Sequence, residues 1–104
     1  MNKNQKLINI LSIACRAGKI ISGDFVIEKA TERKNKIKLI LVASDASEMT
    51  KAKYVKLADK TKILLKNTDL EKDSLAACIG KTDRAAVAVC DDGFCKAILK
   101  ILAD

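Results

Sequence analysis

The sequence predicts an α/β fold in which helices cover both faces of a four-stranded sheet. Apolar residues at helical spacing alternate along the chain with short runs rich in branched side chains, which is the pattern of this fold class. The length of 104 residues, of which 49% are hydrophobic, allows one core and leaves no room for a second. Because no proline, repeat or low-complexity linker marks a boundary, we expect residues 1–104 to form a single domain.

The first part of the chain predicts a helix, a short strand and a second helix. Residues 4–17 are apolar around most of a helical circumference, so this helix should be largely buried, and Gly18 should end it. Residues 19–22 follow as a short strand. Asp24 is placed to cap or charge-complement a helix over about residues 24–34.

The next run, IKLILVA at residues 37–43, predicts a strand covered on both faces at the centre of the sheet, because it is short, apolar and rich in branched residues. A helix over about residues 48–60 should turn four residues inward, namely Tyr54, Val55, Leu57 and Ala58. The remaining expected elements are a strand at 62–66, a helix at 69–79, a strand at 84–90 and a helix at 93–103.

The chain is poorly supplied for catalysis or metal binding. It has no histidine, and its four cysteines, which form no C-x-x-C pair, are interpreted as small buried hydrophobes or incidental thiols: Cys15, Cys78, Cys90 and Cys95. Gly80, Lys81 and Thr82 look like the tail of a phosphate-binding loop, but that loop needs a glycine at position 75 and a helix afterwards. Asp91 and Asp92 are better explained as a helix start. We therefore predict a protein that is not an enzyme and uses no cofactor or metal.

Charge is spread unevenly along the chain. Residues 1–66 hold 15 Lys and Arg residues and 6 acids, whereas residues 67–104 hold 5 and 7. The basic half favours a polyanionic partner, and RNA or DNA fits better than an anionic membrane because the cations accompany no lone amphipathic segment. A merely Lys-rich soluble domain is the alternative. No run approaches the roughly 20 apolar residues of a membrane span, and no cleavable signal appears, so we expect a cytoplasmic protein without membrane contact.

Residues 18–38 carry the most information about function, because a glycine turn stands at the head of a helix with an aromatic and basic stripe. At about 100° per residue, Phe25, Lys29 and Arg33 form a row turned away from the apolar side of the helix. Turn and row together suit a nucleic-acid backbone, with Phe25 free to lie against an unstacked base. The alternative interpretation places Phe25 under a neighbouring loop and the cations on a solvated face.

The motifs that carry a family resemblance are Ala17 to Lys19, Ser22 and Gly23, Lys29 and Ala30, Arg33, Ala43 to Ala46, Leu75, Ile79 to Lys81, and Ala85 to Val89. In order and spacing they resemble the kink-turn RNA-binding ribosomal proteins of the archaeal L7Ae and eukaryotic L30e type, most closely the small bacterial YlxQ-like branch. The resemblance covers nearly the whole chain. It implies a three-layer α/β/α sandwich with a mixed four-stranded sheet.

The resemblance also implies binding to a kinked RNA internal loop with tandem sheared G·A pairs and a flipped nucleotide, as in ribosomal RNA. On this pattern Gly23 lets the RNA backbone approach, and Lys29 and Arg33 meet phosphates. Lys72 matches a basic contact position, and residues 81–84 match the loop that covers the flipped base. The full expected RNA-binding set is Lys19, Ser22, Gly23, Asp24, Phe25, Lys29, Arg33, Lys72, Lys81, Thr82 and Arg84.

The chain departs from the family pattern at the start of this helix. The family's Asn-Glu pair, which reads the G·A bases, is replaced by Phe25 and Val26, and Val26 is expected to pack inward. Ser44 stands where the family often has Glu, and Asp24 would repel a phosphate placed directly on it. The leading hypothesis is a monomeric, non-catalytic RNA-binding protein whose partners are structured RNA and the ribosome. The alternative is a protein-interaction module on the same scaffold, which an exposed Phe25 would also suit.

Overall fold

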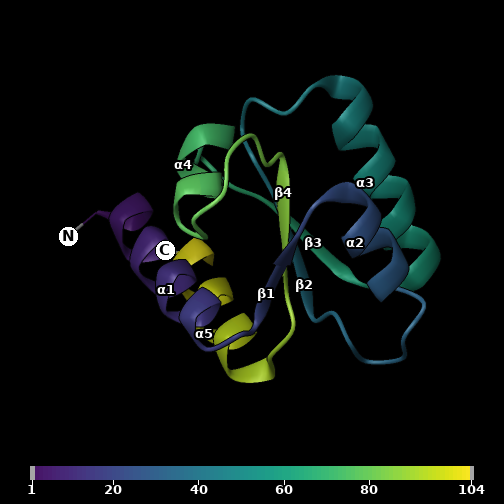
Figure 1. Ribbon diagram of the computed structural model, residues 1–104, viewed down its shortest axis with the longest axis horizontal. Helices are drawn as coiled ribbons and strands as arrows, with labels where there is room; N and C mark the ends of the chain where they lie inside the picture. The colour runs from purple at the N-terminus through teal and green to yellow at the C-terminus, as the bar shows by residue number, and fades with distance from the viewer. Residues whose placement is uncertain (1, 104) are drawn as a thin grey trace.

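The computed structural model describes residues 2–103 of the chain, and the predicted alternation of helices and strands is confirmed with shifts of a few residues at most ends (Figure 1). Its elements are α1 (Lys3–Arg16), β1 (Ile20–Ser22), α2 (Asp24–Ala30), β2 (Leu39–Val42), α3 (Glu48–Thr61), β3 (Leu64–Asn67), α4 (Lys72–Ala77), β4 (Ala86–Val89) and α5 (Asp92–Ala103).

The four strands form one mixed sheet in the order β1-β4-β2-β3. β4 pairs antiparallel with both β1 and β2, whereas β3 pairs parallel with β2. In this register Val42, at the end of β2, pairs with Ala86 at the start of β4 and with Asn67 at the end of β3. Ser22 at the end of β1 pairs with Val87. The carboxyl ends of β1, β2 and β3 therefore lie at one end of the sheet, together with the loop that enters β4.

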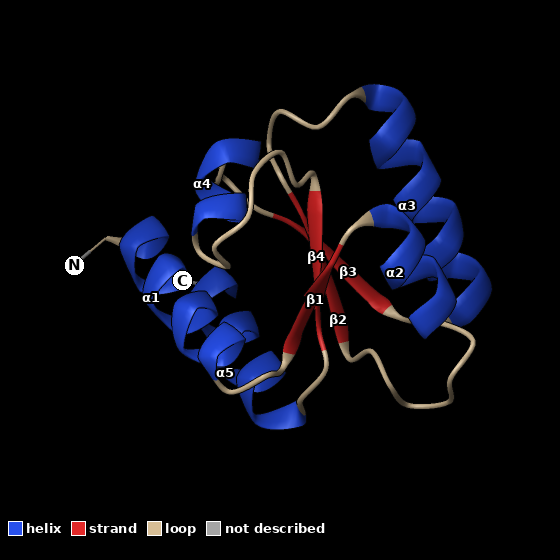
Figure 2. Ribbon diagram, in the orientation of Figure 1, coloured by secondary structure: helices blue, strands red, loops and turns tan. Residues whose placement is uncertain are grey.

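Helices cover the two faces of the sheet as separate layers, which confirms the predicted α/β/α sandwich (Figures 1 and 2). α1, α4 and α5 pack against Leu39 and Leu41 of β2 and against the matching side of β4. α2 and α3 pack against Ile40 and Val42 on the opposite face. All four residues of β2 are buried, so the apolar run around them forms a strand covered on both faces, as predicted.

Three burial predictions are wrong, for one physical reason. The helix predicted to be largely buried, α1, buries only Leu7, Leu11 and Ala14 among its residues, and leaves Ile13 47% exposed. Val26 of α2 and Val55 of α3, both expected to face inward, are each 49% exposed. A helix in the outer layer of a sandwich presents one stripe to the sheet, so apolar residues beyond that stripe stay in contact with solvent.

Helix α2 ends at Ala30, well before its predicted end, so Arg33 lies in the turn that follows. The backbone N–H of Glu32 donates to Lys29 O at 3.2 Å and that of Arg33 to Ala30 O at 3.1 Å, which are the tighter bonds of a terminating helix. The residues after Ala30 are TERKNK, which offer no apolar side chain to the sheet, and a short helix without packing is unstable in water. The predicted helical row is therefore wrong at Arg33 and holds for Phe25 and Lys29.

Candidate nucleic-acid interface

The end of the sheet where β1, β2 and β3 finish carries the candidate interface, and Gly23 forms its central turn. Gly23 joins β1 to α2 with φ of 93°, a left-handed conformation that side-chain-bearing residues rarely adopt. It acts as the N-cap of α2, and no side chain caps this helix. The first residue of α2 is Asp24, whose carboxylate complements the positive end of the helix dipole.

Asp24 is held by two residues of α3. The Tyr54 hydroxyl donates a hydrogen bond to Asp24 Oδ1, and Lys53 Nζ lies 2.9 Å from Asp24 Oδ2. The Tyr54 hydrogen bond, with the ammonium of Lys53 beside it, holds the pKa of Asp24 below its ordinary value. Tyr54 itself is fully buried, and burial together with the bond to Asp24 raises its pKa. The start of α2 is thereby fixed to α3.

Arg84 ties the loop before β4 to the end of β1. Its Nε donates to Ser22 Oγ at 3.2 Å, and one of its terminal nitrogens donates to the carbonyl oxygen of Thr82 at 2.9 Å. The guanidinium is half-buried and has further N–H groups beyond these two bonds. Asp83, which lies between Thr82 and Arg84 in the sequence, has φ of 51°, which Asp tolerates better than most residues. The end of β1 and the loop before β4, about sixty residues apart in the sequence, are thus joined at the same end of the sheet.

These segments enclose a hollow of about 360 Å³, which we call the interface hollow. Its walls come from the starts of α2, α3 and α4 and from the loop entering β4: Gly23, Asp24, Ser47, Thr50, Lys72, Asp83, Arg84, Ala85 and Ala86. The backbone N–H of Lys72 donates to Asp45 Oδ1 at 2.7 Å, which places the start of α4 against the end of β2. Both charge signs line the hollow, so it offers cations for phosphates and acceptors for base amino groups.

Beside the hollow, α2 presents an exposed face that we call the α2 ridge: Phe25, Val26 and Lys29. Phe25 is 73% exposed, so the prediction that it lies off the core is confirmed and the alternative that it folds under a loop is wrong. Lys29 Nζ lies 3.5 Å from Glu32 Oε2, with both side chains mostly in solvent. An exposed ion pair of this kind contributes little to stability and leaves the cation available to a ligand.

The sequence of this chain matches a known protein family. The profile of the ribosomal protein L7Ae/L30e/S12e/Gadd45 family matches residues 5–100. The chain belongs to this family. As a member of the L7Ae family it is not an enzyme, in agreement with the prediction from sequence.

Two relatives of this chain carry the same name, RNA-binding protein YlxQ. The one from Bacillus subtilis (strain 168) is 33% identical over 93 residues, which is 89% of this chain and 91% of the relative. The one from Enterococcus faecium is 35% identical over 92 residues, 88% of this chain and 86% of the relative.

Two solved structures share the fold. A Bacillus halodurans protein of unknown function superposes with a TM-score of 0.84 at 26% identity, over 94% of this chain and 97% of that one. A 15.5 kD RNA-binding protein from Giardia lamblia superposes with a TM-score of 0.72 at 15% identity, over 97% of this chain and 85% of that one.

Within this L7Ae-type chain, the structure brings most of the expected RNA-binding residues to one end of the sheet. Gly23, Asp24, Lys72 and Arg84 line the hollow, and Ser22 lies directly behind it as a partner of Arg84. The exposed residues Lys81 and Thr82 lie on the loop that Arg84 anchors. Phe25 and Lys29 stand on the α2 ridge.

Two expected residues lie elsewhere. Lys19 precedes β1 and therefore lies at the opposite end of the sheet, where its carbonyl accepts from Cys90 N at 2.8 Å. Arg33 lies beyond the carboxyl end of α2, while the hollow adjoins its amino end. Neither residue shares the hollow with the others, because Lys19 lies at the opposite end of β1 and Arg33 beyond the opposite end of α2.

Several residues of the site were missed by sequence reasoning. Tyr54 was assigned to the core alone, although a buried tyrosine hydroxyl needs a partner and Asp24 offered one. Ser47 caps α3, accepting from Thr50 N at 3.1 Å, and the Ser-x-x-Thr spacing signals such a start. Asp45 was quoted for the resemblance without a role. Nothing in the sequence shows that Lys53 would reach across to Asp24.

The remaining features of residues 2–103 add no second chemical site. No helix within this range is long and apolar enough to cross a membrane, and its acidic and cysteine side chains form no group of three suited to a metal ion. All four cysteines are free thiols, of which Cys95 is buried and the other three are half-buried. Burial raises the pKa of Cys78, Cys90 and Cys95, which favours the protonated form of these thiols. Asp91 accepts from Phe94 N at 2.9 Å and starts α5, as predicted.

Proposed function

We propose that this chain binds structured RNA through the interface hollow and the α2 ridge. The observation that carries the proposal is their juxtaposition, in which the Gly23 turn, the loop held by Arg84 and the exposed ring of Phe25 share one end of the sheet. Phosphates would meet Lys72, Arg84 and Lys29, and an unpaired base would lie on Phe25. The names of the two relatives, both RNA-binding proteins, support the same conclusion.

The finer proposal is that the RNA is a kink-turn or a similarly bent internal loop, in ribosomal RNA or another structured RNA of the cytoplasm. A hollow beside a protruding ridge suits a sharply bent RNA backbone better than a straight duplex. A bent backbone can follow the protein from the ridge into the hollow, so that both surfaces contact the same RNA. Asp24 does not prevent this, since Lys53 and Tyr54 already engage its carboxylate. Because Phe25 and Val26 replace the base-reading pair of the family, we expect recognition by shape and stacking more than by guanine edges.

The test is electrophoretic mobility of the purified protein with a kink-turn RNA and with a matched duplex that lacks the bulge. We expect a discrete complex with the kinked RNA at a concentration at least about tenfold lower than with the duplex, a preference of about 1.4 kcal/mol. Equal affinity for both would refute kink recognition and leave general RNA binding. Failure to bind either RNA would refute the proposed function itself.

Salt dependence gives a second test of the same interface. If about four to six phosphates are neutralised, log affinity should fall against log salt with a slope of about −3 to −5. The net charge of +7 supplies the cations for this. A flat response between low and physiological salt would argue against a polyanion.

A second candidate function rests on the same ridge. Phe25 and Val26 form an exposed apolar pair where the family pattern has polar residues, and such a pair suits docking of another protein. The Phe25→Ala variant separates the two functions, because only RNA binding predicts a loss of RNA affinity.

A further inference from the structure

The sheet has one edge that its helices leave open. β3 is hydrogen-bonded to β2 on one side and to no other strand of residues 2–103 on its outer side. Its Leu65 packs with the α2 and α3 layer. On the other face Leu64 is 43% exposed and Lys66 is also exposed, whereas the equivalent residues of β2 are fully buried. The α1 and α5 layer therefore stops short of β3.

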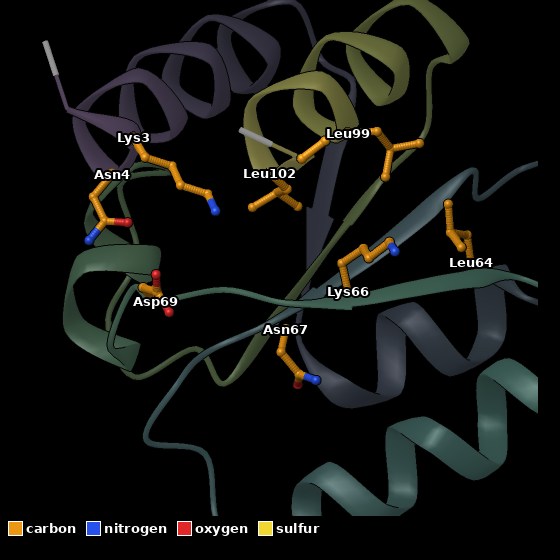
Figure 3. A pocket seen from close by; sticks show the side chains of 9 residues that line it. Lys3, Asn4, Leu64, Lys66, Asn67, Asp69, Leu99 and Leu102 are labelled. Carbon is orange, nitrogen blue, oxygen red and sulfur yellow. The ribbon is translucent and has the colours of Figure 1, made fainter.

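Between β3 and that layer runs a groove of about 420 Å³, which we call the β3 groove. Leu64 and Lys66 of β3, Leu99 and Leu102 of α5, and Lys3 of α1 line it, with Asp69 at one end. In Figure 3 Leu99 and Leu102 point from α5 toward β3, while Leu64 and Lys66 rise from β3 toward α5. The groove shares no lining residue with the interface hollow.

The charged residues around the leucines of the groove indicate which kind of ligand fits it. Lys3 and Lys66 form no ion pair with any residue in the described part of the chain, and Asp69 is the sole acid among the described lining residues. A second copy of this chain, with its net charge of +7, would bring another Lys66 against the same edge, and an edge lysine opposes such pairing. None of the described residues that line the groove is aromatic, so they offer no ring on which a base would stack. An acidic polypeptide matches both the leucines and the two ammonium groups.

We propose that the β3 groove binds an extended, acidic segment of a protein partner, which adds to the outer edge of β3 as a fifth strand. The backbone groups of β3 that face away from β2 supply the ladder hydrogen bonds. Side chains of the added strand that face α5 meet Leu64 and Leu99 where they are apolar, and Lys3 and Lys66 where they are acidic. The interface hollow stays free, so one molecule can hold RNA and a protein at the same time.

The experiment follows backbone amide shifts of the ¹⁵N-labelled protein during titration with a synthetic peptide of about nine residues made of valine and glutamate. We expect saturable shifts confined to residues 64–67 and 99–103. Two matched peptides serve as controls. Replacing every glutamate by lysine should abolish binding, and N-methylation of alternate amides should abolish it as well, because a strand ladder needs those donors.

Charge reversal at the groove sharpens the test. Lys66→Glu should weaken the acidic peptide at least about tenfold, because a like charge then faces the ligand. Lys56→Glu, an equal change of net charge at an exposed position of α3 in the other layer, should leave its affinity unchanged. Thermal melting of both variants establishes that they fold.

Four outcomes of the peptide and variant experiments would overturn the proposal. These are equal binding of the acidic and basic peptides, absence of saturation at millimolar peptide, shifts that map to the interface hollow, and a dimer of the unmodified protein that Lys66→Glu abolishes. RNA titration that shifts residues 64–67 first would likewise assign the groove to RNA.

Discussion

The two halves of the candidate interface are built in opposite ways. Around the hollow, two charged side chains are held in place: Asp24 by Tyr54 and Lys53, and Arg84 by Ser22. On the α2 ridge the side chains extend into solvent, with Phe25 73% exposed and Lys29 in a solvent-exposed ion pair. The contacts around the hollow link separate elements of the fold, whereas the side chains of the ridge contribute almost nothing to stability.

This difference implies a division of roles. The hollow fixes where the backbone of α2 and of the loop entering β4 lies, so changes there should alter stability and binding together. The ridge supplies contacts that exist only in the complex, so changes there should alter binding alone. Substitutions at four positions test this division, in order of expected effect.

The largest effect is expected at Tyr54. Tyr54→Ala should cost about 3–5 kcal/mol of unfolding free energy, because a fully buried ring is replaced by a cavity. Tyr54→Phe keeps the ring and loses the bond to Asp24, which should cost about 1 kcal/mol because the Asp24 carboxylate is half-exposed. Chemical denaturation measures both. If Tyr54→Phe were as stable as the unmodified protein, the hollow would not be held in the way described.

Phe25→Ala should reduce RNA affinity by about 1–3 kcal/mol, the usual worth of a base stacked on an aromatic ring. Its unfolding free energy should change by less than about 0.5 kcal/mol, since the side chain is largely in solvent. Val55→Ala, an exposed apolar position on α3, is the matched control and should change neither. A large loss of stability in Phe25→Ala would show that the ring supports the fold, and the contrast between the hollow and the α2 ridge would then be wrong.

Lys29→Ala should weaken RNA of any sequence and reduce the salt slope by about 1, because one phosphate contact is lost. Its melting temperature should stay unchanged, since the pair with Glu32 is exposed. Lys96→Ala on α5, in the opposite helix layer, removes the same charge as a control. Equal losses of RNA affinity in the two variants would show that the effect comes from net charge and not from a contact of Lys29.

The smallest effect is a pH dependence carried by Asp24. Its pKa lies below the ordinary value of 3.8, so the folded state holds this proton less tightly than the unfolded state. The stability from this group is therefore present above pH about 3.8 and lost as the pH falls through the lowered pKa. Asp24→Asn should be less stable than the unmodified protein at pH 7, and the difference should shrink near pH 3. A difference independent of pH would show that the carboxylate charge is not involved.

The fold was predictable because hydrophobic spacing and length determine it. Leu39–Val42 is apolar at every position, and so short an apolar run rich in branched side chains favours a strand covered on both faces. Helix ends were less predictable, as α2 shows, since the helix stops at Ala30 for lack of packing beyond it, whereas the sequence pattern extended it to about residue 34. Burial was overestimated at Val26 and Val55. The spacing of apolar residues identifies which side of a helix faces the sheet, but it does not show how wide a stripe of that side the sheet covers.

The site was predictable where it depends on the local chain and unpredictable where it depends on contacts between elements. The Gly23 turn and the exposure of Phe25 follow from neighbouring residues. The bonds from Tyr54 to Asp24 and from Arg84 to Ser22 join residues 30 and 62 positions apart. Such pairs are set by how helices and loops pack, and one sequence does not reveal them.

The central claim is that the hollow and the α2 ridge together form the RNA interface, and amide shift mapping with a kink-turn RNA tests it most directly. On the ¹⁵N-labelled protein at low salt, we expect the first saturable shifts at residues 22–29 and 80–84, with little change at residues 64–67 on the far edge of the sheet. Shifts centred on β3 and α5, or no shifts with any structured RNA, would contradict the account.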